Sequence, residues 1–187
     1  MTARCGRYWW LFAVLTVSGL TADLASKATV FSLLPPQHEI VVIPHFFSIF
    51  HQERLNQGAV FGLGGQWGAN ANQLFALVSA AAAIAIVWWI TRPGHLDSLS
   101  LSSSLGLLLA GALGNLYDRA RLGGVRDFLW LYYRTEPHDW ASSRFDWPIF
   151  NVADMCLVSG ACLLFLYGLL GPSPSTGAMA TKTTGTS

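Results

Sequence analysis

GALGNLYDRARLGGVRD, residues 111 to 127, is the stretch that decides the fold. It begins as the end of an uncharged apolar run and then holds two aspartates, three arginines and a pair of glycines. A hydrophobic helix that finishes in this way is expected where hydrocarbon gives way to water. A second, shorter break of the same kind follows at Phe150 to Asp154. We therefore expect both breaks to lie at a membrane surface.

The composition around this stretch is that of a membrane protein. The chain of 187 residues is 52% hydrophobic and only 11% charged, whereas soluble domains carry about 25% charged residues. A net charge of +1 provides no basic surface for nucleic acid. Cys5, Cys156 and Cys162 have neither a disulfide framework nor metal-ligand spacing.

Four apolar stretches approach the roughly 20 residues that a helix needs to cross a bilayer. Their approximate bounds are 8–28, 70–90, 97–117 and 149–170. Four spans place both ends of the chain on the same side of the membrane. We predict an all-α membrane protein, a four-transmembrane-helix bundle formed by residues 1–170 as a single domain. Residues 171–187, rich in Pro, Ser, Thr and Gly, predict a disordered tail.

The connection between the first and second spans, residues 31–68, is too long to be a bare loop. Its prolines exclude a continuous helix, while EIVVI and FFSIF are β-prone and a glycine-rich exit follows. The sequence predicts a small β-sheet here that lies on the membrane surface.

In the third span, small residues recur every four positions and let another helix approach closely. They are Ser102, Gly106, Ala110 and Gly114, and Asp118 continues the row. One interpretation of Asp118 and Arg119 is a helix-end ion pair; the other places them in a polar cluster with Asn115. Because an arginine next to an acid indicates a structural charge partner, we expect Asp118 to matter for folding more than for chemistry.

Two other aspartates are better candidates for chemistry. Asp127 follows a Gly-Gly turn and precedes apolar residues that could re-enter the interface. Asp154 lies near the start of the last span, one turn after Asn151, which could cap that helix. An ionisable group inside a span costs roughly 2.5–3.5 kcal/mol, which indicates a function. The alternative for Asp154 is a helix-start carboxylate that backbone amides satisfy.

Other polar residues leave alternatives open. Asp23 and Lys27 have the order and spacing of a helical ion pair, or they form a solubilising exit from the membrane. Asn56 could bind a peptide backbone or be a plain turn residue. The sequence has no HExxH, GxSxG or SxxK element. We expect no metal and no cofactor.

If Asp127 and Asp154 meet, one of them should hold a proton. Two ionised carboxylates about 4 Å apart repel by on the order of 4 kcal/mol at an effective dielectric near 20. A pair that shares one proton is the aspartic-protease arrangement. The charged member takes a proton from the attacking water, and the neutral member donates one to the developing oxyanion.

Five motifs, in this order, resemble the lipoprotein signal peptidases (signal peptidase II), bacterial inner-membrane aspartyl proteases with four transmembrane helices. The motifs are DLASK (23–27), NQGAVFG (56–62), GALGNLYDR (111–119), VRDF (125–128) and FNVAD (150–154). The resemblance implies cleavage of the signal peptide from diacylglyceryl-modified prolipoproteins, just before the lipidated cysteine. It assigns the catalytic pair to Asp127 and Asp154. The residues that it implies bind substrate or support the site are Asp23, Lys27, Asn56, Gly58, Asn115, Asp118, Arg119, Asn151 and Ala153.

The resemblance also implies that both termini are cytoplasmic, with the active site toward the periplasmic face and the β-sheet extracytoplasmic, between the first two helices. The positive-inside rule favours the reverse, since seven of the eleven Lys and Arg lie opposite the termini. We follow the resemblance because several of these arginines lie beside acids. The segment from Asp127 to Asp154 is longer than is usual in the family, and we expect it to affect substrate choice. We expect a monomer that acts on diacylated prolipoproteins among membrane phospholipids, without nucleic acid.

Two other classes of protein remain as alternatives. A membrane transporter or proton-relay protein would also use intramembrane carboxylates, but near mid-span, whereas each acid here lies within a few residues of a span end. A noncatalytic membrane scaffold would explain the row of small residues but not Asp154 together with Asn151.

Overall fold

The structure is a computed structural model that describes residues 6–58, 69–92, 96–136 and 143–170. The predictions for the tail at 171–187, and for most of the glycine-rich exit after Asn56, lie outside these residues.

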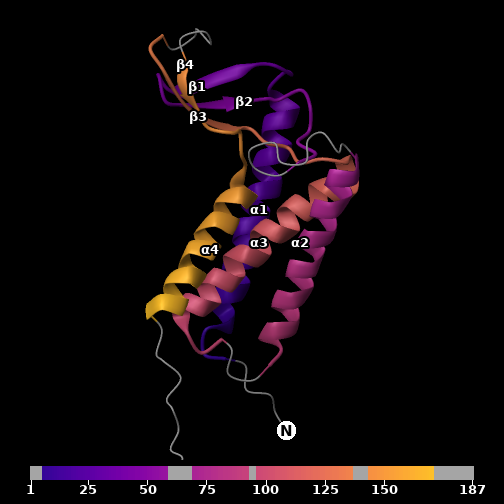
Figure 1. The fold of residues 1–187 in the computed structure, drawn as a ribbon, viewed down its shortest axis with the longest axis vertical. Helices are drawn as coiled ribbons and strands as arrows, with labels where there is room; N and C mark the ends of the chain where they lie inside the picture. Colours follow the sequence, from indigo (N-terminus) through magenta and orange to yellow (C-terminus); the bar gives the residue numbers. More distant parts are fainter. Residues whose placement is uncertain (1–5, 59–68, 93–95, 137–142, 171–187) are drawn as a thin grey trace, which may run out of the picture.

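Within these described residues, four helices are long and apolar enough to cross a membrane. They are α1 (Trp9–Leu33), α2 (Ala69–Ile90), α3 (Leu99–Leu122) and α4 (Val152–Leu170). They run alternately up and down, with a small sheet at one end of the bundle, while α1 begins and α4 ends at the other (Figure 1). The predicted four-helix bundle with a small sheet is confirmed.

Two helices continue past the predicted spans. The expected spans 8–28 and 97–117 stop five residues before α1 and α3 end. The charged residues that were interpreted as exits from hydrocarbon are buried inside the protein instead. Asp23, Lys27 and Asp118 are all 0% exposed. Their charges therefore meet partners in neighbouring elements, and the helices extend beyond them.

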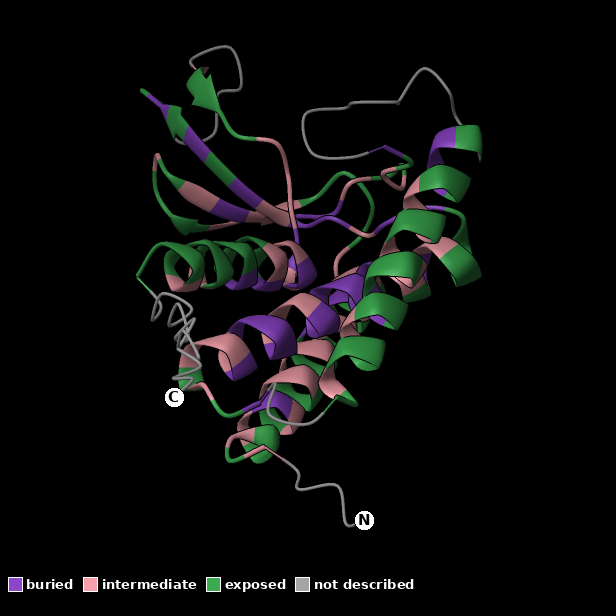
Figure 2. Ribbon diagram, turned by 60° about the horizontal axis from the view of Figure 1, so that its bottom comes forward, coloured by how far each residue is buried: buried purple, intermediate pink, exposed green. Residues whose placement is uncertain are grey.

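Helix α3 is the centre of the bundle and packs against the other three helices. In its most apolar 18-residue window 61% of residues are buried, against 6% for α2; Figure 2 shows this burial along the ribbon. The predicted row of small residues lies entirely among the buried residues of α3. At Gly106, an added Cβ would lie 2.8 Å from the Phe12 carbonyl oxygen of α1. Small side chains therefore let α3 approach its neighbours closely.

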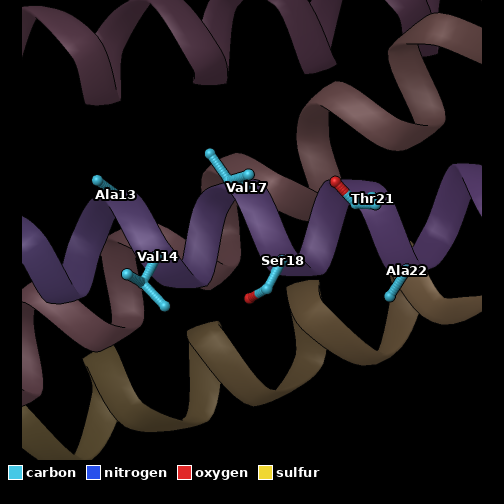
Figure 3. Close-up of a pocket in the computed structure, with 6 residues that line it drawn as sticks. All are labelled: Ala13, Val14, Val17, Ser18, Thr21 and Ala22. Carbon is cyan, nitrogen blue, oxygen red and sulfur yellow. The ribbon is translucent and has the colours of Figure 1, made fainter.

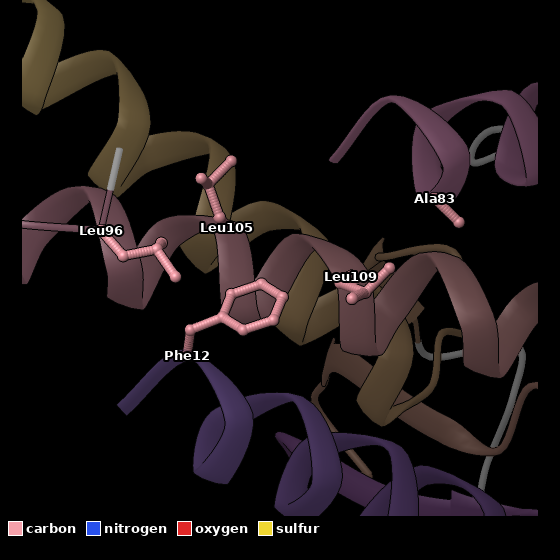
Figure 4. Close-up of a cluster of buried hydrophobic side chains, with 5 residues drawn as sticks. All are labelled: Phe12, Ala83, Leu96, Leu105 and Leu109. Carbon is pink, nitrogen blue, oxygen red and sulfur yellow. The ribbon is translucent and has the colours of Figure 1, made fainter. Parts of the chain in front are cut away.

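An apolar cluster closes the bundle between α1, α2 and α3 (Figure 4). Its buried members are Phe12, Ala83, Leu96, Leu105 and Leu109. Large apolar side chains elsewhere on α2 and α4 point outward and are exposed, as lipid-facing residues are.

The sheet contains four antiparallel strands in the order β1-β2-β3-β4. They are β1 (Glu39–Ile43), β2 (Phe47–Phe50), β3 (Leu129–Arg134) and β4 (Ser143–Asp146). The prediction that the sheet is formed by the segment between the first two helices was incomplete. β1 and β2 come from that segment, but β3 and β4 come from the segment between α3 and α4. β3 pairs with β2 in the register Phe47↔Leu131. The apolar residues after Asp127 thus enter this sheet.

Candidate active site

Two short backbone bridges bring the polar breaks of the sequence together beside the sheet. Asn56 pairs with Val125, with N–H···O distances of 2.9 and 2.8 Å. Leu129 pairs with Phe150, with distances of 2.8 and 3.0 Å. Asp127 lies between the two bridges in sequence. The loop after β2, the exit of α3 and the start of α4 are therefore held at one place.

Local backbone chemistry sets the positions of both candidate acids. Gly123 ends α3 in the left-handed region, with φ of 78°, and its N–H bonds the Arg119 carbonyl at 3.2 Å. α4 begins with a reciprocal cap: Asn151 Oδ1 accepts from the Asp154 N–H at 3.0 Å, and Asp154 Oδ2 accepts from the Asn151 N–H at 3.1 Å. The predicted Asn151 cap therefore forms. The alternative interpretation of Asp154, a helix-start carboxylate that backbone amides satisfy, holds for Oδ2, which accepts from the Asn151 N–H.

Asp127 and Asp154, the aspartate pair, are surrounded by amide donors. Asp127 Oδ1 accepts from Asn151 Nδ2 at 2.6 Å, and Oδ2 accepts from Asn56 Nδ2 at 2.8 Å. Asp154 Oδ1 accepts from Asn115 Nδ2 at 2.8 Å. With the Asn151 N–H on Asp154 Oδ2, each of the four carboxylate oxygens accepts a bond from a neutral N–H group. Asn151 donates to both acids and thus holds them together.

The environment of Asp127 favours its protonated form. Its side chain is buried, and this burial raises the pKa from 3.8 to about 7; the charge of Asp154 acts in the same direction. Hydrogen bonds from Asn56 and Asn151 oppose the increase. Asp127 can therefore gain or lose a proton near neutral pH, as a proton-sharing pair requires.

Asp23 and Lys27 form the predicted ion pair, with Nζ 2.8 Å from Asp23 Oδ2. Both side chains are fully buried, so the alternative of a solubilising exit from the membrane is wrong. Asp23 Oδ1 also accepts from the Ala153 N–H at 2.8 Å. This bond fastens α1 to the first turn of α4, directly before Asp154.

The ion pair proposed between Asp118 and Arg119 is not present. Asp118 pairs with Arg126 at 2.7 Å, whereas Arg119 donates to the Gly58 carbonyl at 3.2 Å and lies over the Phe75 ring. Adjacent residues on a helix point about 100° apart. Asp118 consequently faces the buried network, whereas Arg119 faces α2 and the loop after β2.

The structure brings the remaining predicted residues into the same region, so that hydrogen bonds join nearly all of them. The resemblance implies that Asn56, Asn115, Arg119 and Asn151 line the site and hold the substrate backbone, which stays a prediction. In this structure the side-chain amides of the three asparagines donate to the aspartate pair. Sequence reasoning missed Arg126 as the partner of Asp118. The two are eight residues apart across a glycine turn, a spacing that no helical pattern marks.

A shallow apolar groove of about 680 Å³ lies away from this polar network, on the outer flank of α1 (Figure 3). It is lined by Ala13, Val14, Val17, Ser18, Thr21 and Ala22. Because this lining has no ionisable side chain, the groove offers no acid or base for catalysis.

Comparison with known proteins shows which family has this arrangement. A family profile described as signal peptidase (SPase) II matches residues 15–170. The chain belongs to the signal peptidase II family. The lipoprotein signal peptidase of Pseudomonas fluorescens is 37% identical over 164 residues, 88% of this chain and 89% of that protein. The lipoprotein signal peptidase of Symbiobacterium thermophilum is 35% identical over 162 residues, 86% of this chain and 95% of that protein.

Two solved structures share the fold of this chain. Both are described as bacterial membrane enzymes and superpose with a TM-score of 0.67. One is 28% identical and covers 86% of this chain and 87% of its own; the other is 26% identical and covers 92% and 100%. Signal peptidase II membership makes the protein a peptidase with a role in lipoprotein signal-peptide processing. The four membrane-capable helices place it among bacterial membrane proteins.

Proposed function

We propose that the protein is an aspartic endopeptidase that removes the signal peptide from diacylglyceryl-modified prolipoproteins, cleaving just before the lipidated cysteine. The observation that carries this proposal is the aspartate pair itself. Two carboxylates from different segments are held by one residue, Asn151, which donates to both. The raised pKa of Asp127, about 7, supports the sharing of one proton between them.

The proposed reaction moves two protons in the addition of water and two more in the collapse that follows, and the aspartate pair exchanges all of them without a cofactor. The ionised carboxylate takes a proton from a water molecule as that water attacks the scissile carbonyl carbon. The protonated carboxyl donates its proton to the carbonyl oxygen, which gives a neutral tetrahedral diol. Collapse of the diol breaks the C–N bond: the carboxyl that gained a proton in the first step donates it to the leaving amine nitrogen, and the carboxylate that lost its proton takes one from a hydroxyl of the diol, which leaves the carboxylic acid product. The pair again holds one proton at the end.

The charge of the surrounding network supports this proton count. With one proton on the aspartate pair, the site has three negative and three positive groups and is neutral. A second ionised carboxylate would leave an uncompensated charge in a buried region, which is costly. The other charged groups of the network are Asp23, Asp118, Lys27, Arg119 and Arg126.

The position of the pair suits a substrate that is itself anchored in the membrane. The site lies where the helices meet the sheet, so a bond next to a lipid-modified residue at the membrane surface could reach it. We place this end at the periplasmic face of the inner membrane, with both termini cytoplasmic. The enzyme would act as a monomer, on diacylated prolipoproteins surrounded by phospholipid.

A transporter or proton relay fits the structure less well. Charged residues along the spans are confined to the end beside the sheet. In the described helices no Asp, Glu, Lys, Arg or His lies between this network and the opposite helix ends. A proton that reached the aspartate pair would find no further ionisable group across the bundle.

The test is cleavage of a diacylated prolipoprotein by purified wild-type protein and by Asp127→Asn and Asp154→Asn. We expect each substitution to lower kcat by about 10³-fold or more, because each removes a proton-transfer group. Asp146→Asn is the matched control, since Asp146 is exposed in β4 and its carboxylate accepts a hydrogen bond from the neighbouring Ser143 hydroxyl, away from the site. Near-normal turnover in either site variant would exclude the assigned mechanism. Equal cleavage of precursors with and without the diacylglyceryl group would exclude the proposed substrate class.

A further inference from the structure

We propose that Lys27 is a positioning residue that acts on the aspartate pair through the side-chain amide of Asn115. This inference rests on the proposed function and assigns a task within it. The expected role of Lys27 was general support of the site. The contacts of its ammonium group define a more specific role, which is to decide the direction in which a neighbouring amide points.

The ammonium group of Lys27 lies among three acceptor side chains. Its Nζ lies 2.8 Å from Asp23 Oδ2, 3.1 Å from Asn115 Oδ1 and 3.4 Å from Asp118 Oδ2. An ammonium carries three N–H donors and no acceptor; here it donates hydrogen bonds to Asp23 and Asn115 and makes a longer ion-pair contact with Asp118. The side chain is fully buried. Water therefore cannot replace any of these oxygens without a structural change.

The hydrogen bond from Lys27 sets the orientation of the Asn115 amide. Its oxygen must face Lys27, because an NH₂ group in the same place would oppose donor to donor. The NH₂ group then points to Asp154 Oδ1, at 2.8 Å. The same Asn115 oxygen also accepts from Asn151 Nδ2 at 3.2 Å, and that nitrogen donates to Asp127 Oδ1 at 2.6 Å. One amide thus orients a second, and together they direct donors at both acids.

Removal of the ammonium would release this arrangement. Asn115 could then rotate and present its oxygen, in place of a donor, to Asp154. Its NH₂ group would then face the NH₂ group of Asn151. The positive charge of Lys27 also lowers the pKa of Asp127, so loss of Lys27 moves that pKa further up. The other charged groups around Lys27 and the pair are Asp23 from α1, Asp118 and Arg119 from α3, Arg126 from the loop after α3, and Asp154 from α4.

A double-mutant cycle separates this role from that of a simple brace. We measure kcat, KM and the pH profile of cleavage for Lys27→Met, Asn115→Ala and the double variant. Each single change should lower kcat by about 100-fold, with KM changed by less than about 3-fold. Because Lys27 acts through Asn115, the double variant should be no slower than the slower single variant. The pH profile of Lys27→Met should move to higher pH.

Lys27→Met leaves two buried carboxylates with less positive charge, so the cycle is repeated in an Asp23→Asn background. In that background Lys27→Met leaves the site with its wild-type net charge, because Asp23→Asn has already removed one negative charge. Asp23→Asn alone is the reference for this second cycle, so its own effects through the Lys27 and Ala153 contacts cancel from the comparison. Additive losses, about 10⁴-fold in the double variant, would overturn the proposal. Failure of the Asp23→Asn, Lys27→Met variant to fold would also count against the proposal, because Lys27 would then be required for folding itself.

The outcome also distinguishes this inference from the proposed function. If the wild-type protein does not cleave the diacylated precursor, the proposed function fails. If it cleaves the precursor and the cycle is additive, only the role of Lys27 fails.

Discussion

Asp118 and Asp127 lie nine residues apart in the same stretch, and their partners differ in kind. Asp118 is bonded to the side chain of Arg126 and lies near the Lys27 ammonium. The Asp127 carboxylate accepts hydrogen bonds from the neutral amides of Asn56 and Asn151. Cations hold a carboxylate ionised, whereas burial among amides beside a second acid favours a proton. The partners therefore agree with the proposed roles, which are support of the site for the first acid and proton transfer for the second.

At this scale we predict that ionisation of Asp127 destabilises the fold. Its pKa rises from 3.8 to about 7 on folding, so its contribution is complete below pH about 4 and is lost as the pH rises through about 7. A shift of about three units corresponds to about 4 kcal/mol. Asp127→Asn cannot ionise, and its Tm should fall less than that of the wild type between pH 5 and pH 8. Thermal unfolding in detergent measures this difference.

The wild type and Asp127→Asn are compared by how much their Tm changes with pH and not by the Tm at one pH. The reason is that the substitution also removes an acceptor oxygen at every pH. Asp146→Asn, on the exposed strand β4, should unfold with the wild-type pH dependence. If Asp127→Asn and the wild type lost the same Tm over this range, the raised pKa would be wrong.

At the scale of elements, close packing of α3 against α4 determines where Asp154 lies. The two helices touch through glycines: a Cβ added at Gly111 would overlap the Ala153 carbonyl and lie 2.7 Å from Leu157 Cγ. A Cβ added at Gly160 would lie 2.9 Å from the Ser104 carbonyl of α3. Because Ala153 directly precedes Asp154, any separation of these helices moves one member of the aspartate pair.

We therefore expect Gly111→Ala to reduce both stability and activity. Overpacking at such a contact destabilises by about 1–3 kcal/mol, and displacement of the start of α4 should lower kcat by about 10-fold or more, because catalysis is sensitive to small misplacements. Thermal unfolding and cleavage assays measure the two effects. Gly168→Ala is the matched control, since its added Cβ meets nothing within 4 Å. A Gly111→Ala variant as stable and active as Gly168→Ala would contradict this account.

At the scale of the whole molecule, the sheet is assembled from two distant segments. β1 and β2 precede α2, while β3 and β4 follow α3. Both pairs lie at the same end of the bundle because the helices alternate in direction (Figure 1). Pairing of β2 with β3 closes the sheet beside the aspartate pair. Thus the long segment after Asp127 extends the surface next to the site.

The proposed orientation predicts which end is accessible from outside the cell. In a cysteine-free background, Val42→Cys in exposed β1 should react with a membrane-impermeant maleimide in intact spheroplasts. Thr91→Cys, at the end of α2 away from the sheet and also exposed, should react only after the membrane is permeabilised. The opposite pattern would reverse the orientation and agree with the positive-inside count.

The sequence alone determined the features that depend on local pattern. Apolar length predicted four helices, spacing predicted the Asp23–Lys27 pair and the Asn151 cap, and ordered motifs indicated the family. Tertiary structure decided the second half of the sheet, the pairing of Asp118 with Arg126, and the directions of the asparagine amides. These features depend on residues that are far apart in the chain or separated by a turn. A strand needs its partner and a buried charge needs its counterion, and only the folded chain brings them together.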